Sequence, residues 1–228
     1  FFSNIQNCHD IINKSVQLAN DAKLDYLDKH TDKDDKLFIA GSIGPYGAYL
    51  SDGSEYSGDY KNVTIAELKQ FHYERLKLLT MNEKCDLLIL ETMPNFLEIK
   101  TLIELLEVEF KEKLGFVKPY ILSMSIRDAT HLADGTEIQL VVDYLNQRNL
   151  FDQNNLISIG SNCLPLKHSV SFLKQLKTLL PNEFPMSIYP NSGEIYNGIE
   201  KNWSVDPELM ENGKLFQYKW ENISKDWV

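Results

Sequence analysis

Cysteine is scarce in this sequence, and its placement does not suggest disulfides. The 228 residues contain three cysteines, Cys8, Cys85 and Cys163, which are widely separated and odd in number. Disulfide frameworks of secreted domains usually have an even number of cysteines. The cysteine content therefore favours a reducing compartment, and we expect a cytoplasmic protein.

Basic residues are also fewer than acidic ones, and the apolar runs are short. Lys and Arg number 23 against 33 Asp and Glu, which gives a net charge of −10. Without a basic stripe, nucleic acid and anionic membranes are poor partners. No apolar run approaches the roughly 18 residues of a membrane span. We therefore expect small-molecule substrates and neither a nucleic acid nor a membrane partner.

The residues that are present have an ordinary globular balance, with 43% hydrophobic and 25% charged. Short apolar runs alternate with amphipathic patterns, which predicts parallel βα units with one functional edge. We expect strands at 37–41, 86–90, 119–126, 156–159 and 185–189. We expect helices at 4–27 and 64–79, after Asn95, at 136–144, from Val170 to Leu180, and from Trp220 through Trp227, with 196–218 irregular. Capping boxes are expected at Thr64/Glu67 and Thr136/Gln139.

The run from Leu156 to Pro165, LISIGSNCLP, is the stretch that points most directly to chemistry. Leu156, Ile157 and Ile159 predict a buried strand that stops just before Cys163. The carboxyl end of such a strand is where α/β barrels and open α/β sheets place reactive groups. A lone cysteine is also a common buried hydrophobic residue, so both interpretations remain open for Cys163. Cys8, on a helical apolar stripe, and Cys85, before a strand, are expected to be structural.

Two further features accompany these strand ends. The segment Gly41 to Tyr60 has five glycines and four tyrosines in twenty residues, which predicts a long functional loop. It carries no GxGxxG pattern and no Walker lysine, so it is not a phosphate-binding loop. Glu91 follows the apolar residues Leu87 to Leu90, where a buried carboxylate needs a cation or several donors. That cation could come from an internal salt bridge or from a ligand.

The strand-end sequences GSIGPYGAYLSDGSEYSGDY, ETMPN, DGT, GSNC and YPNSGEIY together resemble the homocysteine S-methyltransferase family, in the order found there. The segment from Gly41 to Tyr60 is similar to the branch that uses S-methylmethionine or S-adenosylmethionine as methyl donor. The resemblance implies a (β/α)₈ TIM-type barrel, of which this chain would supply five βα units, strands three to seven. We therefore expect residues 1–228 to be one homocysteine-binding barrel domain, incomplete at both ends.

The resemblance also implies a zinc ion held by three cysteines, with homocysteine sulfur as the fourth ligand. Cys163 matches the family's cysteine on the sixth strand, so we expect it to be a zinc ligand and a catalytic residue. The family's other two ligands form an adjacent cysteine pair, which this sequence lacks, and we expect them beyond Val228. Glu91 resembles the glutamate that binds the homocysteine amino group. We expect Ser42, Tyr46, Asn162 and Asn191 to contact substrate as well.

Two alternatives compete with methyl transfer. A Schiff-base aldolase would need a lysine at a strand end, but the ends carry Ser42, Glu91, Arg127, Cys163 and Asn191. A non-catalytic fragment that cannot bind zinc is the stronger competitor, because one thiolate does not make a zinc site. For the isolated 228-residue chain, we expect weak zinc binding and no activity.

Overall fold

The structure is a computed structural model that describes residues 5–30 and 36–191. Beyond residue 191 it describes only 194–197, 202–205, 210–211, 214–215, 224–225 and 227. The predicted helix at Trp220 lies largely outside these residues, although Ser224 and Lys225 are helical and Trp227 packs against the core. No helix in the described part of the chain is both long enough and apolar enough to span a membrane.

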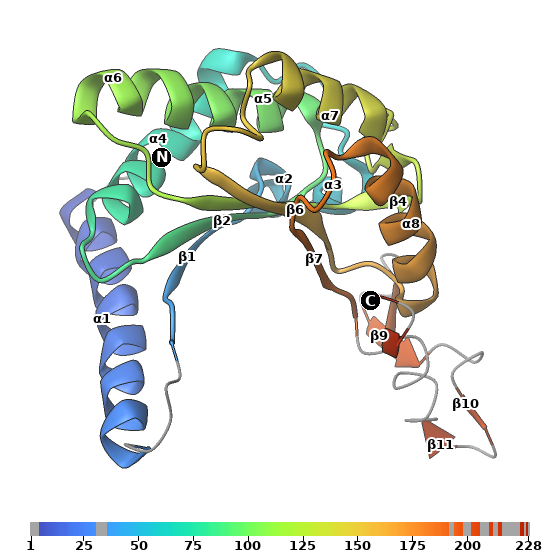
Figure 1. Cartoon of the computed structure of the whole chain (residues 1–228), viewed down its shortest axis with the longest axis horizontal. Coiled ribbons are helices and arrows are strands. Elements are labelled where there is room, and N and C mark those ends of the chain that lie inside the picture. Colours follow the sequence, from blue (N-terminus) through green and yellow to red (C-terminus); the bar gives the residue numbers. More distant parts are fainter. Residues whose placement is uncertain are drawn as a thin grey trace.

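A curved parallel sheet forms the centre of the structure (Figure 1). Its strand order is β1-β2-β3-β6-β7, and each neighbouring pair is parallel. The strands are β1 (Ala40–Ile43), β2 (Leu87–Met93), β3 (Tyr120–Met124), β6 (Leu156–Asn162) and β7 (Met186–Tyr189). Within the described residues, β1 and β7 each pair on one side only. The parallel α/β class predicted from the sequence is confirmed.

Helices cover the convex side of the sheet, and none of the long helices in the described part of the chain lies across its concave side (Figure 1). The long helices are α1 (Ile5–Lys29), α4 (Ile65–Met81), α5 (Phe96–Glu104), α7 (Ile138–Gln147) and α8 (Ser169–Leu179). A π-helix, η1 (Leu105–Phe110), joins α5 to α6 (Lys111–Leu114), and a 3₁₀ turn, η2 (Leu166–His168), precedes α8. Leu88 and Leu90 of β2 are fully buried beneath the helices. The alternate residues Ala40 and Ser42 of β1 are exposed on the concave side.

Several predicted boundaries differ from the structure. The first strand begins at Ala40 rather than residue 37, because Asp86 caps the backbone N–H of Ile39 at 2.7 Å and Phe38 is 68% exposed. The segment from Gly41 to Tyr60 is not one irregular loop, since it contains α2 (Tyr46–Leu50) and α3 (Ser54–Ser57).

The third strand ends at Met124, and the following residues form a small antiparallel pair, β4 (Ile126–Asp128) with β5 (His131–Leu132). The region 196–218, predicted to be irregular, includes two more antiparallel pairs. These are β8 (Glu194–Asn197) with β9 (Asn202–Val205), and β10 (Met210–Glu211) with β11 (Lys214–Leu215).

One of the two predicted capping boxes is confirmed. Thr64 and Glu67 exchange hydrogen bonds at the start of α4. The box at Thr136 and Gln139 is wrong, because Asp134 accepts from the Thr136 N–H at 2.8 Å and α7 begins after Glu137. Asp134 also accepts from the N–H of Phe96 at 2.7 Å, so this aspartate ties the start of α5 to the turn before α7.

Candidate functional site

The carboxyl ends of β1, β2, β6 and β7 meet at one edge of the sheet, and their polar side chains are linked. Ser42 donates a hydrogen bond from its hydroxyl to Oε1 of Glu91. The Tyr189 hydroxyl donates to Oε2 of the same carboxylate at 3.2 Å. The backbone N–H of Cys163 donates to the carbonyl oxygen of Tyr189 at 3.2 Å, and Asn191 Nδ2 donates to the Cys163 carbonyl oxygen, also at 3.2 Å. The predicted residues Ser42, Glu91, Cys163 and Asn191 therefore belong to one cluster.

Glu91 is half-buried and bound by hydroxyl groups. Burial raises the pKa of Tyr189 above its usual range, and the charge of Glu91 adds to the rise, so the phenol remains a donor. Among the described residues, no ion pair involves Glu91. The internal salt bridge is thus not formed in this part of the chain, where the partners of the carboxylate are the Ser42 and Tyr189 hydroxyls.

Cys163 is exposed, which excludes the alternative that it is a buried hydrophobic residue. It follows the last residue of β6 and has φ +53°, in the left-handed region. Gly160 allows β6 to approach β7 closely, because a Cβ at this position would lie 1.6 Å from the Ser187 carbonyl oxygen. Cys8 lies on α1, and Cys85 is buried before β2, where its thiol donates to Leu87 O at 3.1 Å. Those placements agree with the structural roles predicted for Cys8 and Cys85.

The other two predicted substrate contacts, Asn162 and Tyr46, lie in a buried polar network and in an aromatic cluster, respectively. Asn162 is 2% exposed, and its carboxamide contacts Thr92, Ser123 and Cys163. Tyr46 belongs to an aromatic cluster with Tyr49, Tyr60 and Phe71, in which its ring packs edge-on against Phe71 at 5.1 Å between centroids. The hydrogen bonds that link Ser42, Glu91 and Tyr189 do not extend to Tyr46, whose backbone N–H donates to Glu98 at 2.5 Å.

A buried polar group beneath that aromatic cluster was not predicted. Glu98 and His72 are fully buried, with 2.7 Å between Glu98 Oε1 and His72 Nε2, and Tyr60 donates to Glu98 Oε2 at 2.5 Å. Arg75 lies 3.2 Å from His72 Nδ1, and since a guanidinium only donates, Nδ1 must accept. His72 is therefore the neutral Nε2–H tautomer that donates to Glu98. Burial lowers the pKa of His72, in agreement with this assignment.

The sequence contains a signal for this group. His72 falls on the same helical stripe as Leu68, Leu76 and Leu79. Glu98 lies within the apolar sequence FLEIKTLIE. A titratable residue on an apolar stripe indicates a buried polar partner, because an unpaired one would be costly.

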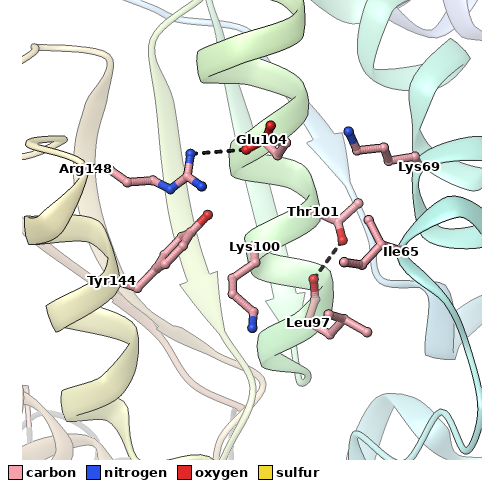
Figure 2. Close-up of a pocket in the computed structure, with 8 residues that line it drawn as sticks. All are labelled: Ile65, Lys69, Leu97, Lys100, Thr101, Glu104, Tyr144 and Arg148. Atoms are coloured by element: carbon pink, nitrogen blue, oxygen red, sulfur yellow. Dashed lines mark hydrogen bonds and ion pairs between the residues drawn. The ribbon is translucent and has the colours of Figure 1, made fainter.

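A hollow of about 310 Å³ lies on the opposite, helical side, between α4, α5 and α7 (Figure 2). Lys69, Lys100 and Arg148 line it, together with Glu104. Its charges already have partners, since Arg148 pairs with Glu104 at 3.1 Å and Lys69 with Glu109 at 2.5 Å. Lys100 lies over the ring of Phe96 at 4.6 Å. This hollow is distinct from the strand-end cluster.

The described residues do not form a complete metal site. They contain no group of three His, Cys, Asp or Glu side chains that could hold an ion. Cys163 brings one thiol to the expected edge, whereas a structural or catalytic zinc ion needs three or four protein ligands. The residues described here therefore cannot hold zinc by themselves.

Comparisons with known proteins agree with the resemblance found in the sequence. The chain is 39% identical over 193 residues to a homocysteine S-methyltransferase of Escherichia coli, covering 85% of this chain and 57% of that protein. It is 36% identical over 196 residues to homocysteine S-methyltransferase YbgG of Bacillus subtilis, covering 85% and 58%. The chain thus spans somewhat more than half the length of these relatives.

Solved structures and a family profile give the same result. The metallated form of the homocysteine methyltransferase MmuM from Escherichia coli superposes with a TM-score of 0.71 at 38% identity, covering 81% of this chain and 59% of that one. The profile of the homocysteine S-methyltransferase family matches residues 2–220. The chain belongs to the homocysteine S-methyltransferase family.

Proposed function

We propose that the protein containing this chain transfers a methyl group from a sulfonium donor to the sulfur of homocysteine, giving methionine. The observation that carries the proposal is the Glu91 carboxylate, held by two hydroxyls at the strand-end edge beside Cys163, with no cationic partner among the described residues. An amino acid's ammonium group would supply the missing cation, through a charge-assisted hydrogen bond. The thiol of the same substrate would then lie toward Cys163.

The methyl transfer is a single displacement at the methyl carbon. The acceptor loses its thiol proton to solvent, and its sulfur attacks the methyl carbon of the donor. The new carbon–sulfur bond forms as the donor's bond breaks, and the electron pair leaves on the donor sulfur, which becomes a neutral thioether. The chain's own part is to bind and orient the acceptor, which can supply much of the rate by removing rotational and translational freedom in advance.

We propose that the methyl donor is S-methylmethionine or S-adenosylmethionine, as in one branch of the family. The tyrosine-rich segment that includes Tyr46, Tyr49 and Tyr60 supports this choice, because aromatic faces attract sulfonium cations. We also propose Cys163 as one thiol ligand of a zinc site whose other ligands lie outside the described residues. On this proposal the five strands are part of a closed barrel.

The test is a transfer assay with the full-length protein, homocysteine and a donor carrying a deuterated methyl group. We expect methionine that carries the intact label, from S-methylmethionine or S-adenosylmethionine and not from betaine. A protein that is folded and metal-loaded yet forms no labelled methionine with any sulfonium donor would exclude the proposed reaction.

A second candidate concerns the isolated 228-residue chain. The described residues contain no group of three possible metal ligands, which favours a fold that keeps the strand-end surface without catalysis. Comparing the isolated chain with the full-length protein in the same assay separates the two, since activity of the isolated chain would exclude this candidate.

A further inference from the structure

The end of β2 contains a β-bulge. Leu90 pairs with Leu122 and Met93 with Met124, so Glu91 and Thr92 together oppose the single residue Ser123 of β3. In a regular strand Met93 would share the concave side with Glu91, because side chains alternate. The extra residue instead returns Met93 to the core, where it is fully buried, and leaves Glu91 and Thr92 both half-buried. Bulges of this kind re-aim side chains next to functional sites.

The bulge imposes an unusual backbone conformation on Thr92. Its φ is +60°, in the left-handed region. A β-branched residue there is an outlier, because its Cβ substituents crowd the backbone. Such a conformation persists only where surrounding contacts hold it. The bulge has also removed the Thr92 N–H from the regular pairing with β3, so this donor needs another acceptor.

Asn162, the last residue of β6, lies on the far side of β3 from Thr92 in the strand order. Its carboxamide accepts from the Thr92 backbone and also contacts the Thr92 side chain. Its Oδ1 accepts from the Thr92 N–H at 2.8 Å, and its Nδ2 donates to Thr92 Oγ1 at 2.7 Å. The amide orientation is fixed, because a backbone N–H requires an oxygen as its acceptor. The remaining oxygen lone pair accepts from Ser123 Oγ at 2.8 Å, and the remaining amide proton points to Cys163 Sγ at 3.3 Å.

All of the polar capacity of Asn162 is therefore used within the protein. Two donors and two acceptor positions meet four protein groups, and the side chain is 2% exposed. A carboxamide in this state has nothing left for a substrate. Its partners are instead Thr92, which follows Glu91, the Ser123 hydroxyl and the thiol of its own neighbour, Cys163.

We propose that Asn162 is a positioning residue that holds the Thr92 bulge and thereby fixes Glu91 relative to Cys163. The clamp itself rests on the hydrogen bonds above, and its effect on turnover rests on the proposed function. Without Asn162 the bulge relaxes, and the two groups that we assign to the amino and sulfur ends of one substrate lose their spacing.

The kinetic test is a double-mutant cycle of Asn162→Ala with Thr92→Gly in the full-length protein. Glycine adopts φ +60° without strain, so the backbone of the Thr92→Gly variant needs the clamp far less. We expect Asn162→Ala alone to lower kcat/KM for homocysteine on the order of 10- to 100-fold, the scale of a misplaced catalytic group. In the Thr92→Gly background, Asn162→Ala should lower kcat/KM for homocysteine only several-fold. Equal losses in the two backgrounds would overturn the proposal and return Asn162 to direct substrate contact.

Amide hydrogen exchange tests the clamp without any activity. Asn162→Ala should speed exchange of the Thr92 N–H at least about 10-fold while leaving Leu88 and Leu90 protected. Asn155→Ala is the matched control, because Asn155 directly precedes the other end of β6 and its Nδ2 donates to Glu107 at 3.1 Å. This control should leave Thr92 exchange and kcat/KM within about twofold of wild type. An unchanged Thr92 rate in Asn162→Ala excludes the clamp even if the protein proves to be a methyltransferase.

Folding of the variants is itself informative. An Asn162→Ala protein that folds only together with Thr92→Gly supports the clamp, because relieving the strain would then replace the hydrogen bonds. If both the single and the double variant fail to fold, Asn162 serves the core in general and the proposal is wrong. A wild-type protein with no methyl transfer but with the expected exchange pattern retains the clamp and rejects only the function.

Discussion

In the proposed function, the Glu91 carboxylate binds the ammonium group of homocysteine. We predict that Glu91→Gln raises KM for homocysteine by roughly 10- to 150-fold, because a charge-assisted hydrogen bond contributes about 1.5–3 kcal/mol. The KM of the methyl donor should change much less. Steady-state kinetics with each substrate varied in turn will measure both.

A truncated acceptor provides the control for Glu91. A thiol of the same length without the amino group should bind wild type and Glu91→Gln alike. The loss of affinity from removing the amino group and the loss from Glu91→Gln should therefore not add. Equal weakening of both substrates, or a large loss of stability with a normal KM, would contradict a role in binding the ammonium group.

Cys163 is the other residue with a distinct expected outcome. Cys163→Ser in the full-length protein should abolish turnover and leave the unfolding midpoint of the metal-free protein nearly unchanged, because the side chain is exposed rather than packed. Cys85→Ser is the contrasting variant, since it places a hydroxyl in a buried site and should lower the midpoint instead. A Cys163→Ser enzyme with normal zinc content and activity would show that the metal assignment is wrong.

At this scale the sequence predicts which residues reach the edge but not what they touch. Ser42, Glu91 and Cys163 follow from counting along strands, since each falls where an apolar run ends. The partners of Asn162 depend on a bulge that shifts the register by one residue at Thr92, and no period in the sequence encodes that shift.

At the scale of the elements, buried His72 and Glu98 join α4, α5 and the Tyr46–Tyr60 segment. This buried pair should make the free energy of unfolding depend on pH. Burial lowers the pKa of His72, which faces Glu98 and Arg75, so the unfolded chain takes up a proton first as the pH falls. The stability supplied by neutral His72 is thus fully present above about pH 6.5 and is lost below it, by up to about 1.4 kcal/mol per pH unit.

His72→Gln isolates this effect. Glutamine keeps one donor toward Glu98 and one acceptor toward Arg75 but does not titrate. Denaturant unfolding between pH 5.5 and 8 should show a smaller slope for His72→Gln than for wild type, and His72→Phe should be less stable than either at every pH. An identical slope in His72→Gln would assign the pH dependence to another group.

The contact between β6 and β7 depends on Gly160. An added Cβ would lie 1.6 Å from Ser187 O, so Gly160→Ala must separate the two backbones, and we predict a loss of several kcal/mol. Gly44→Ala is the matched control, because nothing lies within 4 Å of its added Cβ and its φ is not positive. Thermal unfolding of the two variants should differ clearly, and equal midpoints would contradict the close approach.

Element type was easier to predict than element boundaries. The five parallel strands and the helices between them follow from alternating apolar runs and amphipathic stripes. The two short helices between Gly41 and Tyr60 were missed, because glycine and tyrosine carry little helical signal and tertiary contacts, such as Glu98 with the Tyr46 N–H, hold them in place.

For the whole molecule, zinc content is the decisive measurement. We predict that the isolated 228-residue chain keeps well below one equivalent of zinc after dialysis against a weak chelator, because Cys163 has no second thiol nearby among the described residues. The full-length protein under the same conditions should retain about one. Stoichiometric zinc in the isolated chain would contradict the prediction.

The one-sided pairing of β1 and β7 has a consequence for handling the isolated chain. Each strand presents a row of backbone N–H and C=O groups with no neighbour among the described residues, and such a row is a template for another chain. Concentration would therefore favour edge-to-edge aggregation, so solubility rather than folding energy would set the limit on preparing this arc of sheet by itself.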